Sequence, residues 1–518
     1  MGSRIVELDR LTIAGVREGT LAGRSITVLG LARSGIAMAR FFGDIGARVT
    51  VYDGRTAAQL GPAIEALGGR SVELRLGPDV DPASSWASAD LVATSPSINP
   101  DFPTAEPRLR AALAALVAAH LADPTGAPAL VSETDLFLRL CPCPTIGVTG
   151  TKGKTTTSAL IAALLATDPA HPVVLGGNIG VPLIERLPEL TPDHRVVIEL
   201  SELQLPTLSR GTTVAVYTNV TSDHLDRHGS LEAYRAVKRR LADLVDPDGV
   251  LVLNADDPIV AGYASGAKVP VITYTLGWPS QLGVGLVDGW IVGRSSDAVP
   301  GDPHFDTTGS PEFERLIPIS ELRIPGEHNI SNAMAATAVA TLFMITPEAV
   351  RAAAAAFTGV ENRLEPVGIV DGVRFINDSQ GTQPDAVVAA LQAFPKPLVL
   401  IAGGRDKGVD LSGLGPVAAE RADAAILIGE SGPALEALFT RSGMARVERA
   451  PTLEVAVDRA DQIARELLSA DGATGPATVL LSPAAASFDM FVDYAARGQA
   501  FRDAVAAVAG RSRPAESN

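Results

Sequence analysis

The sequence is poor in cysteine and has fewer basic than acidic residues. The 518 residues include two cysteines, Cys141 and Cys143, which are too few for a four-ligand zinc site and too close in the chain for an unstrained disulfide. The 43 Lys and Arg residues face 59 Asp and Glu residues, for a net charge of −16. Because nucleic-acid binders normally show a basic surface, we expect reduced thiols and no nucleic-acid partner.

Long apolar stretches are also missing. The most apolar segment, residues 111–122, is shorter than the roughly 20 residues that a membrane-spanning helix needs. The first ten residues carry no apolar run behind a basic stretch, as a signal peptide would. We therefore expect a cytoplasmic protein with no membrane insertion. We also expect a monomer.

The length and the 46% hydrophobic content indicate about three domains, each with its own core. Alternating strand and helix patterns predict an α/β fold. We expect a Rossmann-like domain over residues 1–142, a central domain like those of phosphate-loop (P-loop) ATPases over 143–358, and a Rossmann-like C-terminal domain over 359–518. Buried strands are predicted at 195–200, 214–219, 250–254, 373–377, 397–402, 424–428 and 478–482, a helix at 329–343, and an inserted loop or hairpin at 279–318.

The first domain opens with a strand at 25–29, a glycine-rich turn, a helix, and a second strand that ends at Asp53. This order is typical of a nucleotide-binding βαβ unit. Ala32 stands between Gly30 and Gly35, where a dinucleotide site has its second glycine, which lets the backbone approach a pyrophosphate. The pattern therefore argues against a dinucleotide site and is still compatible with binding of a mononucleotide diphosphate.

The most specific motif lies between an apolar strand and the start of a helix. It reads Gly147-Val148-Thr149-Gly150-Thr151-Lys152-Gly153-Lys154-Thr155-Thr156, one residue longer than the usual Walker A spacing. Backbone amides of such a loop and the helix N-terminus bind phosphate oxygens. We expect Lys154 to contact the β- and γ-phosphates of ATP and the Thr155 hydroxyl to bind Mg²⁺.

Three further side chains become candidates beside this loop. Glu199 ends an apolar strand, where an acid in an ATP enzyme typically holds Mg²⁺. His224 follows Asp223 after another strand and is a possible metal ligand. Lys238, in the segment from Tyr234 to Arg240, is the third. Taken alone, Glu199 could equally be a salt-bridge partner, His224 would be a structural histidine, and Lys238 would be an ordinary solvated lysine.

Together these motifs resemble the Mur ligase family, whose members join an amino acid to a UDP-muramoyl precursor of peptidoglycan. The resemblance covers nearly the whole chain, and its last block looks most like the glutamate-adding member. The other motifs that carry it are Gly176-Gly177-Asn178-Ile179-Gly180, Glu199-Leu200-Ser201, residues 219–226, Tyr234 to Lys238, Asn254-Ala255-Asp256-Asp257, residues 326–333, Asn362-Arg363, Asn377-Asp378-Ser379, Gly403-Gly404-Arg405-Asp406-Lys407, residues 481–489 and Arg497-Gly498.

The resemblance implies a ligase that uses ATP and two Mg²⁺ sites to make an acyl phosphate. Its implied catalytic residues are Lys154, Glu199, His224 and Lys238, and its metal ligands are Thr155, Glu199, His224 and Lys238 as a carbamate. The implied ATP contacts are Gly150, Thr151, Lys152, Gly153, Lys154, Thr155, Thr156, Asn329, Arg363 and Asp378. The implied UDP-sugar positions are Arg33, Asp53, Arg55, Ser95 and Asn178, and the other substrate positions are Ser201, Gln380, Thr382, Lys407, Ser487 and Tyr494.

One departure from the family pattern concerns the amino acid. D-glutamate-adding members usually carry a lysine where this chain has Gln380, and a neutral amide cannot replace that charge. The run Asp378-Ser379-Gln380-Gly381-Thr382-Gln383-Pro384 resembles the branch that adds L-glutamate. We therefore expect addition of L-glutamate to UDP-N-acetylmuramoyl-L-alanine, with D-glutamate as the alternative.

Three other functions compete with this interpretation. A folylpolyglutamate synthase would share the ATP-binding core, but it lacks the roughly 140 residues that precede the phosphate loop here. A nicotinamide oxidoreductase would fit Gly30 and Asp53 but leaves the phosphate loop unexplained. A non-catalytic nucleotide binder would have no need for the five residues Lys154, Thr155, Glu199, His224 and Lys238 together.

Overall fold

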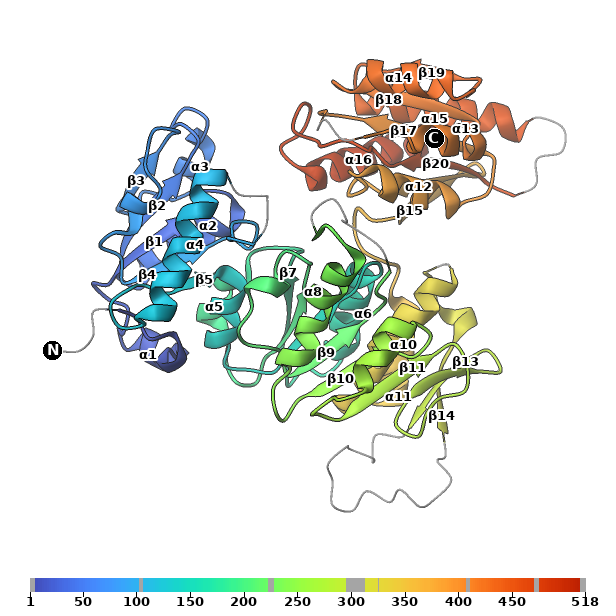
Figure 1. Ribbon diagram of the computed structural model, residues 1–518. Helices are drawn as coiled ribbons and strands as arrows, with labels where there is room; N and C mark the ends of the chain where they lie inside the picture. Colours follow the sequence, from blue (N-terminus) through green and yellow to red (C-terminus); the bar gives the residue numbers. More distant parts are fainter. Residues whose placement is uncertain are drawn as a thin grey trace, which may run out of the picture. The chain divides into compact units, whose positions relative to one another are not determined.

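The computed structural model describes residues 5–101, 106–221, 228–294, 313–324, 326–406, 410–469 and 475–512. The chain divides into two compact units, Met1–Phe357 and Thr358–Asn518. The first unit carries two β-sheets and the second carries one, and helices flank each sheet (Figure 1). In the described part of the chain, no helix is both long and apolar enough to cross a membrane. The expected α/β class is confirmed.

The first sheet is parallel throughout, with strand order β3-β2-β1-β4-β5. Gly35 in the helix after β1 packs so closely that a Cβ would lie 1.8 Å from the carbonyl oxygen of Gly30. The strands are β1 (Ser25–Leu29), β2 (Arg48–Asp53), β3 (Val72–Leu76), β4 (Leu91–Thr94) and β5 (Leu130–Ser132), and the helices are α1 (Ile13–Arg17), α2 (Arg33–Asp44), α3 (Gly61–Glu65), α4 (Pro107–Ala122) and α5 (Glu133–Leu140).

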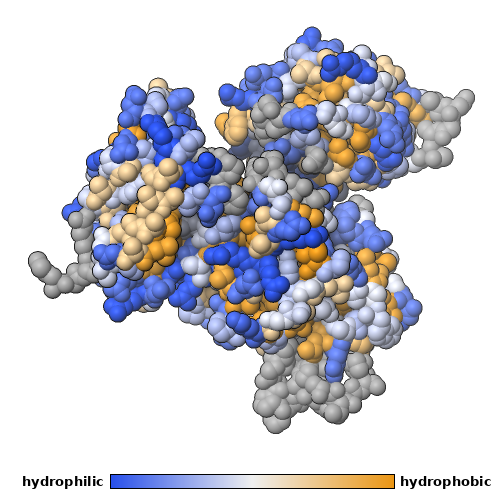
Figure 2. All heavy atoms as spheres, viewed as in Figure 1, coloured by the Kyte–Doolittle hydropathy of each residue, from blue (hydrophilic) through white to orange (hydrophobic). Residues whose placement is uncertain are grey.

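Helix α4 is apolar on most of its surface, not only on its buried side. Leu109, Leu113 and Leu116 pack against the first sheet, while alanines and Leu121 face outward. Figure 2 shows these outward residues as a pale orange area over α4. The helix holds the apolar segment noted in the sequence, and it packs as a surface helix of the sheet.

The central sheet has the order β14-β13-β12-β11-β10-β9-β6-β8-β7, parallel from β7 to β12 and antiparallel from β12 to β14. Its strands are β6 (Thr145–Thr149), β7 (Val173–Gly177), β8 (Arg195–Glu199), β9 (Val214–Tyr217), β10 (Val250–Asn254), β11 (Val271–Thr275), β12 (Val284–Val287), β13 (Trp290–Arg294) and β14 (Phe313–Pro318). Its helices are α6 (Lys154–Leu165), α8 (Leu231–Leu244), α9 (Pro258–Ala261), α10 (Glu327–Leu342) and α11 (Pro347–Ala356).

The expected insertion at 279–318 contains a hairpin. Asp288 and Gly289 join β12 to β13, with φ angles of 49° and 76°. An Asp-Gly pair with positive φ at both positions matches the twist of an antiparallel hairpin. Strand β14 then extends the sheet beyond β13, so the described part of the insertion forms a sheet edge.

The second unit is built on a six-stranded sheet with the order β15-β16-β20-β17-β18-β19, in which only the β15–β16 pair is antiparallel. Alternate residues of β16, β17, β18 and β20 join separate cores, with Val399 and Ile401 against α15 and α16, and Leu400 against α12, α13 and α14. The strands are β15 (Glu365–Val370), β16 (Val373–Asn377), β17 (Leu398–Gly403), β18 (Ala424–Ile428), β19 (Val447–Arg449) and β20 (Ala477–Leu481), and the helices are α12 (Pro384–Gln392), α13 (Leu414–Arg421), α14 (Gly432–Arg441), α15 (Leu453–Leu468) and α16 (Tyr494–Ser512).

Candidate active site

The expected phosphate loop joins β6 to α6, and two of its glycines have positive φ, 153° at Gly150 and 85° at Gly153. Neither position has room for a side chain. A Cβ at Gly150 would lie 1.9 Å from the Thr218 hydroxyl oxygen, and one at Gly153 would lie 2.5 Å from Asn332 Oδ1. The glycines therefore let the loop turn tightly before α6, which leaves the helix N-terminus open toward an anion.

The two residues after β9, Thr218 and Asn219, hold this loop in place by hydrogen bonds. Asn219 Nδ2 donates to the Lys152 carbonyl oxygen at 3.0 Å, and Asn219 Oδ1 accepts from the Lys152 amide at 2.9 Å. The Thr218 hydroxyl donates to the same carbonyl at 2.6 Å, and the Thr151 amide donates to the Asn219 carbonyl. Asn219 thus pairs with the loop as a neighbouring strand would, a role that the sequence motif did not reveal.

Two lysines converge on the carbonyl oxygen of Gly150. Lys154 Nζ donates to it at 2.9 Å and also to the Thr151 carbonyl at 2.8 Å. Lys238 Nζ, on α8, donates to it at 3.0 Å and to the Thr149 hydroxyl at 3.3 Å. Lys238 is fully buried, with its ammonium 5.5 Å from the centre of the Tyr234 ring. It is therefore a buried residue beside the phosphate loop and not a solvated helix lysine.

Glu199 lies at the end of β8, next to β6, with Val148 as its register partner. Its carboxylate is buried, and Oε1 accepts a hydrogen bond of 2.8 Å from Asn178 Nδ2. The other oxygen, Oε2, is buried and receives no hydrogen bond from the described residues. A buried carboxylate oxygen without a donor is costly to maintain, and a divalent cation would satisfy it. The donor set therefore fits Mg²⁺.

The remaining central candidates lie around α10 and the loop. Thr155 is buried, and the Thr157 hydroxyl donates to Asn332 Oδ1, whose amide nitrogen donates to Asn329 Oδ1. Lys152 is exposed, and Thr156 is half-buried. His224 lies outside the described residues.

In the first sheet, Asp53 does not offer a free carboxylate to a ribose. One oxygen accepts from the Leu31 amide at 2.8 Å, and both accept from the Arg55 guanidinium at 3.0 and 2.7 Å. Burial raises the pKa of Asp53, but the Arg55 and Leu31 hydrogen bonds outweigh it and hold the pKa below the ordinary value. Asp53 thus fixes the glycine-rich turn and orients Arg55, which remains half-exposed.

The other first-domain candidates are less constrained. Ser95 shares a hydroxyl hydrogen bond of 2.8 Å with Ser97 at the end of β4, and Arg33 is exposed at the start of α2. All of these positions follow the carboxyl ends of parallel strands, where α/β sheets bind ligands.

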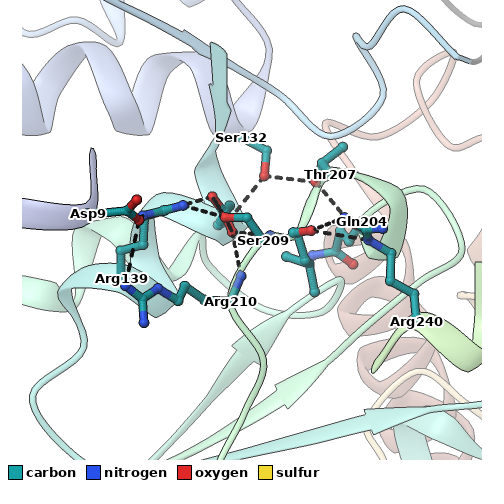
Figure 3. A network of polar contacts seen from close by, with 10 residues as sticks. Asp9, Ser132, Arg139, Gln204, Thr207, Ser209, Arg210 and Arg240 are labelled. Carbon is teal, nitrogen blue, oxygen red and sulfur yellow. Dashed lines mark hydrogen bonds and ion pairs between the residues drawn. The ribbon is translucent and has the colours of Figure 1, made fainter. Parts of the chain in front are cut away.

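A polar network joins α5 of the first sheet's domain to the segment after Glu199 (Figure 3). Asp135 accepts from the Ser209 amide and hydroxyl and from Arg139, whose guanidinium also donates to Asp9. Gln204 Oε1 accepts from the amide and hydroxyl of Ser201, while its Nε2 donates to Thr134. The network therefore ties the candidate substrate residue Ser201 to helix α5.

In the second unit, Asp378 is buried directly after β16. Its Oδ2 accepts from the Ser482 hydroxyl at 2.6 Å, and its Oδ1 accepts from the Leu364 amide at 3.2 Å. Burial raises the pKa of Asp378 to about 6. In the structure this expected ATP contact holds the ends of β16 and β20 together, while Arg363 nearby is exposed.

The candidate glutamate positions of this unit gather on two segments after β16 and β20. Gln380 and Thr382 follow β16, Ser487 follows β20 and is buried, and Tyr494 begins α16. The Gln380 side-chain oxygen is buried and receives no hydrogen bond from the described residues. Lys407 lies outside the described residues.

Sequence reasoning did not assign a role to Arg497. This arginine of α16 has only 1% of its surface exposed, and its guanidinium bonds to both segments that carry the glutamate candidates. The only sequence signal was its place in the motif Arg497-Gly498, since a lone helical arginine usually faces solvent.

Comparison with protein families gives two matches along the chain. Residues 148–340 match the Mur ligase middle domain, and residues 362–485 match the Mur ligase glutamate ligase domain. Together the matches span the phosphate loop, Glu199, Lys238 and the segment after β16.

Two relatives over nearly the full length are both named UDP-N-acetylmuramoylalanine–D-glutamate ligase. The one from Symbiobacterium thermophilum is 37% identical over 93% of this chain and 97% of its own length. The one from Anaeromyxobacter dehalogenans is 38% identical over the same shares of the two chains. Among solved structures, the UDP-N-acetylmuramate–alanine ligase MurC from Thermotoga maritima aligns over 94% of this chain with a TM-score of 0.52 and 18% identity, which shows a shared fold. The chain belongs to the Mur ligase family.

Proposed function

We propose that this chain is an ATP-dependent ligase that adds D-glutamate to UDP-N-acetylmuramoyl-L-alanine. The observation that carries the proposal is the phosphate loop with Lys154 and Lys238 at one carbonyl, together with a buried Glu199 oxygen that accepts no hydrogen bond from the described part of the chain. The relatives named as D-glutamate ligases support the substrate. They do not support the expectation of L-glutamate that rested on Gln380, and they favour its alternative.

The chemistry explains why this reaction needs such a site. A carboxylate is a poor acyl donor, because oxide would have to leave. In the proposed reaction a carboxylate oxygen of the alanine moiety attacks the γ-phosphorus and ADP leaves. The amine of glutamate then attacks the acyl carbon and loses a proton, and phosphate leaves with that carboxylate oxygen. Both steps bring anions together, so cations and fixed hydrogen-bond donors matter more than covalent catalysis.

The residues of the chain have distinct roles in this scheme. The amides of the phosphate loop and the N-terminus of α6 would bind the phosphates, and Lys154 would exchange its two carbonyl acceptors for phosphate oxygens. Thr155 and Glu199 would hold Mg²⁺, which supplies charge neutralisation at the phosphates. We also propose that His224 is a ligand of a second Mg²⁺. A carbamate on Lys238 would replace the lysine's positive charge by a negatively charged oxygen ligand for the metal.

The test is phosphate release from ATP with Mg²⁺ and UDP-N-acetylmuramoyl-L-alanine, comparing D- with L-glutamate. We expect release that requires the UDP substrate and D-glutamate together. Release with L-glutamate alone would restore the interpretation from Gln380. If neither enantiomer gives phosphate release, the proposed substrates are refuted, while the family assignment is unaffected.

A further inference from the structure

We infer that Arg497 is a positioning residue of the glutamate site, holding its two segments together and supplying a buried positive charge beside them. This inference rests on the proposed function and adds a residue to it. Arg497 is the largest of the fully buried side chains, at 1% exposure, so it cannot touch a substrate itself. Its effect must pass through the groups that it binds.

The guanidinium bonds to both segments that leave the carboxyl edge of the sheet. Nε donates to the Ser379 hydroxyl at 3.0 Å, and Nη2 donates to the Ser379 carbonyl at 2.9 Å. On the other segment, Nη1 and Nη2 donate to the Ala485 carbonyl, and Nη1 also donates to that of Ala486, all at 3.3 Å. A planar fork of donors suits this bridging, whereas the point charge of a lysine does not.

These two segments carry the candidate glutamate residues. Ser379 precedes Gln380, and Ala486 precedes Ser487, so each segment has one anchored carbonyl next to a candidate residue. The Ser379 hydroxyl also donates to the Tyr494 carbonyl at 2.7 Å, and the Ala484 amide donates to the Gly381 carbonyl at 2.9 Å. The arginine is therefore the centre of a bonded set that fixes both segments and the start of α16.

The charge of Arg497 is the second part of the inference. Its five hydrogen bonds within the described part of the chain all go to neutral oxygen atoms, while the carboxylates of Asp378 and Asp489 interact with it electrostatically and favour its charged form. Burial lowers its pKa to about 10, which still leaves it protonated at neutral pH. A buried cation favours nearby anions, and a glutamate carboxylate would be a third such anion beside Asp378 and Asp489.

The experiment compares four variants by the Michaelis constants for glutamate, ATP and the UDP substrate. Arg497→Lys keeps a positive charge but loses the planar set of donors, and Arg497→Met loses both. Ser379→Ala removes the hydroxyl that accepts from Nε and leaves the arginine side chain itself in place. Arg511→Met is the matched control, because it removes an exposed arginine of the same helix whose partner is Asp458. Thermal melting shows which variants remain folded.

We expect Arg497→Lys and Ser379→Ala to raise KM for glutamate about tenfold or more, with KM for ATP changed less than about twofold. Burial lowers the pKa of a lysine, so the Arg497→Lys enzyme should regain glutamate affinity as pH falls. The inference fails if KM for glutamate is unchanged in folded variants, or if all constants deteriorate in parallel. If the unaltered chain shows no glutamate-dependent turnover, the proposed function fails instead.

Discussion

Two acidic side chains at strand ends have opposite surroundings. Among the residues that the structure describes, Glu199 has one buried oxygen without a donor, whereas both oxygens of Asp378 accept hydrogen bonds. The first arrangement leaves a place for a cation, and the second joins two strand ends. Residue type and position at a strand end are therefore not enough to distinguish a ligand from a structural acid.

Replacing Glu199 by Gln tests the cation site. The amide keeps the size of the side chain but removes the charge, so we expect turnover to fall about 100-fold or more and the Mg²⁺ concentration for half-maximal activity to rise. Steady-state rates across a Mg²⁺ titration measure both. Glu189→Gln, at an exposed ion pair with Arg186, is the control. An unchanged Mg²⁺ requirement in Glu199→Gln would remove Glu199 from the metal site.

The raised pKa of Asp378 makes a prediction about stability. The folded chain holds this proton up to about pH 6, while the unfolded chain releases it near the ordinary value of 3.8. Between these values the folded state binds more protons, so its free energy of unfolding falls as pH rises, by at most about 1.4 kcal/mol per pH unit.

Denaturant unfolding of the chain and of Asp378→Asn, from about pH 4 to 7, isolates the contribution of Asp378 to the pH dependence of the free energy of unfolding. We expect the variant to gain stability relative to the unaltered chain as pH rises from about 4 to 6, and the difference to level off above pH 6. The asparagine can still bond to Leu364 and Ser482, because the serine hydroxyl can also accept. A constant difference across the range would show that Asp378 has no raised pKa.

At the level of helices and strands, close backbone contacts position the sites. Gly35 lets α2 approach the end of β1, next to the Leu31 amide that Asp53 binds. Gly35→Ala would place a Cβ 1.8 Å from a backbone carbonyl, which cannot rotate away. We expect a loss of about 2 kcal/mol or more in unfolding free energy and weaker binding of the UDP substrate. Gly61→Ala, with no atom within 4 Å of its Cβ, should change neither.

Most strands of the second unit could be predicted from the sequence, because a strand buried on both faces is a continuous apolar run. The segments 373–377 and 424–428 are β16 and β18 without any shift. Strand β3 was missed, since Glu73 and Arg75 interrupt its apolar pattern at a sheet edge. The ambiguous insertion at 279–318 became a hairpin because of Asp288-Gly289, a turn signal that was present in the sequence.

The candidate site was predictable where chemistry fixes the residue type. The spacing around Lys154 identifies the phosphate loop, and the apolar run before Glu199 places that acid at a strand end. The roles of Asn219 and Arg497 come from tertiary contacts with residues far away in the chain, and no local pattern records those contacts. The family resemblance supplied Lys238, and its spacing from Tyr234 and Leu241 places it on the buried face of α8.

In the first unit as a whole, the two sheets share one apolar cluster and the polar network around Asp135. The buried Asp135 carboxylate bonds to the Ser209 and Arg210 amides and pairs with Arg139, whose side chain is also buried. Asp135→Asn would leave that arginine without a buried counterion. We expect a loss of about 3 kcal/mol in unfolding free energy, measured by denaturant titration.

Arg10→Ala is the control for that variant, since the Arg10–Glu7 pair is exposed and should contribute at most about 1 kcal/mol. A stability loss in Asp135→Asn no larger than that of the control would show that the network does not hold the two sheets of this unit together.

The proposed reaction activates the alanine carboxylate of the UDP substrate and transfers the resulting acyl group to D-glutamate. The most direct measurement uses UDP-N-acetylmuramoyl-L-alanine labelled with ¹⁸O in the alanine carboxylate, together with ATP, Mg²⁺ and D-glutamate. Mass spectrometry of the released phosphate should find one ¹⁸O atom transferred from the substrate for each amide bond formed. Amide formation with unlabelled phosphate would contradict the acyl-phosphate route, and phosphate release without amide formation would contradict the ligase.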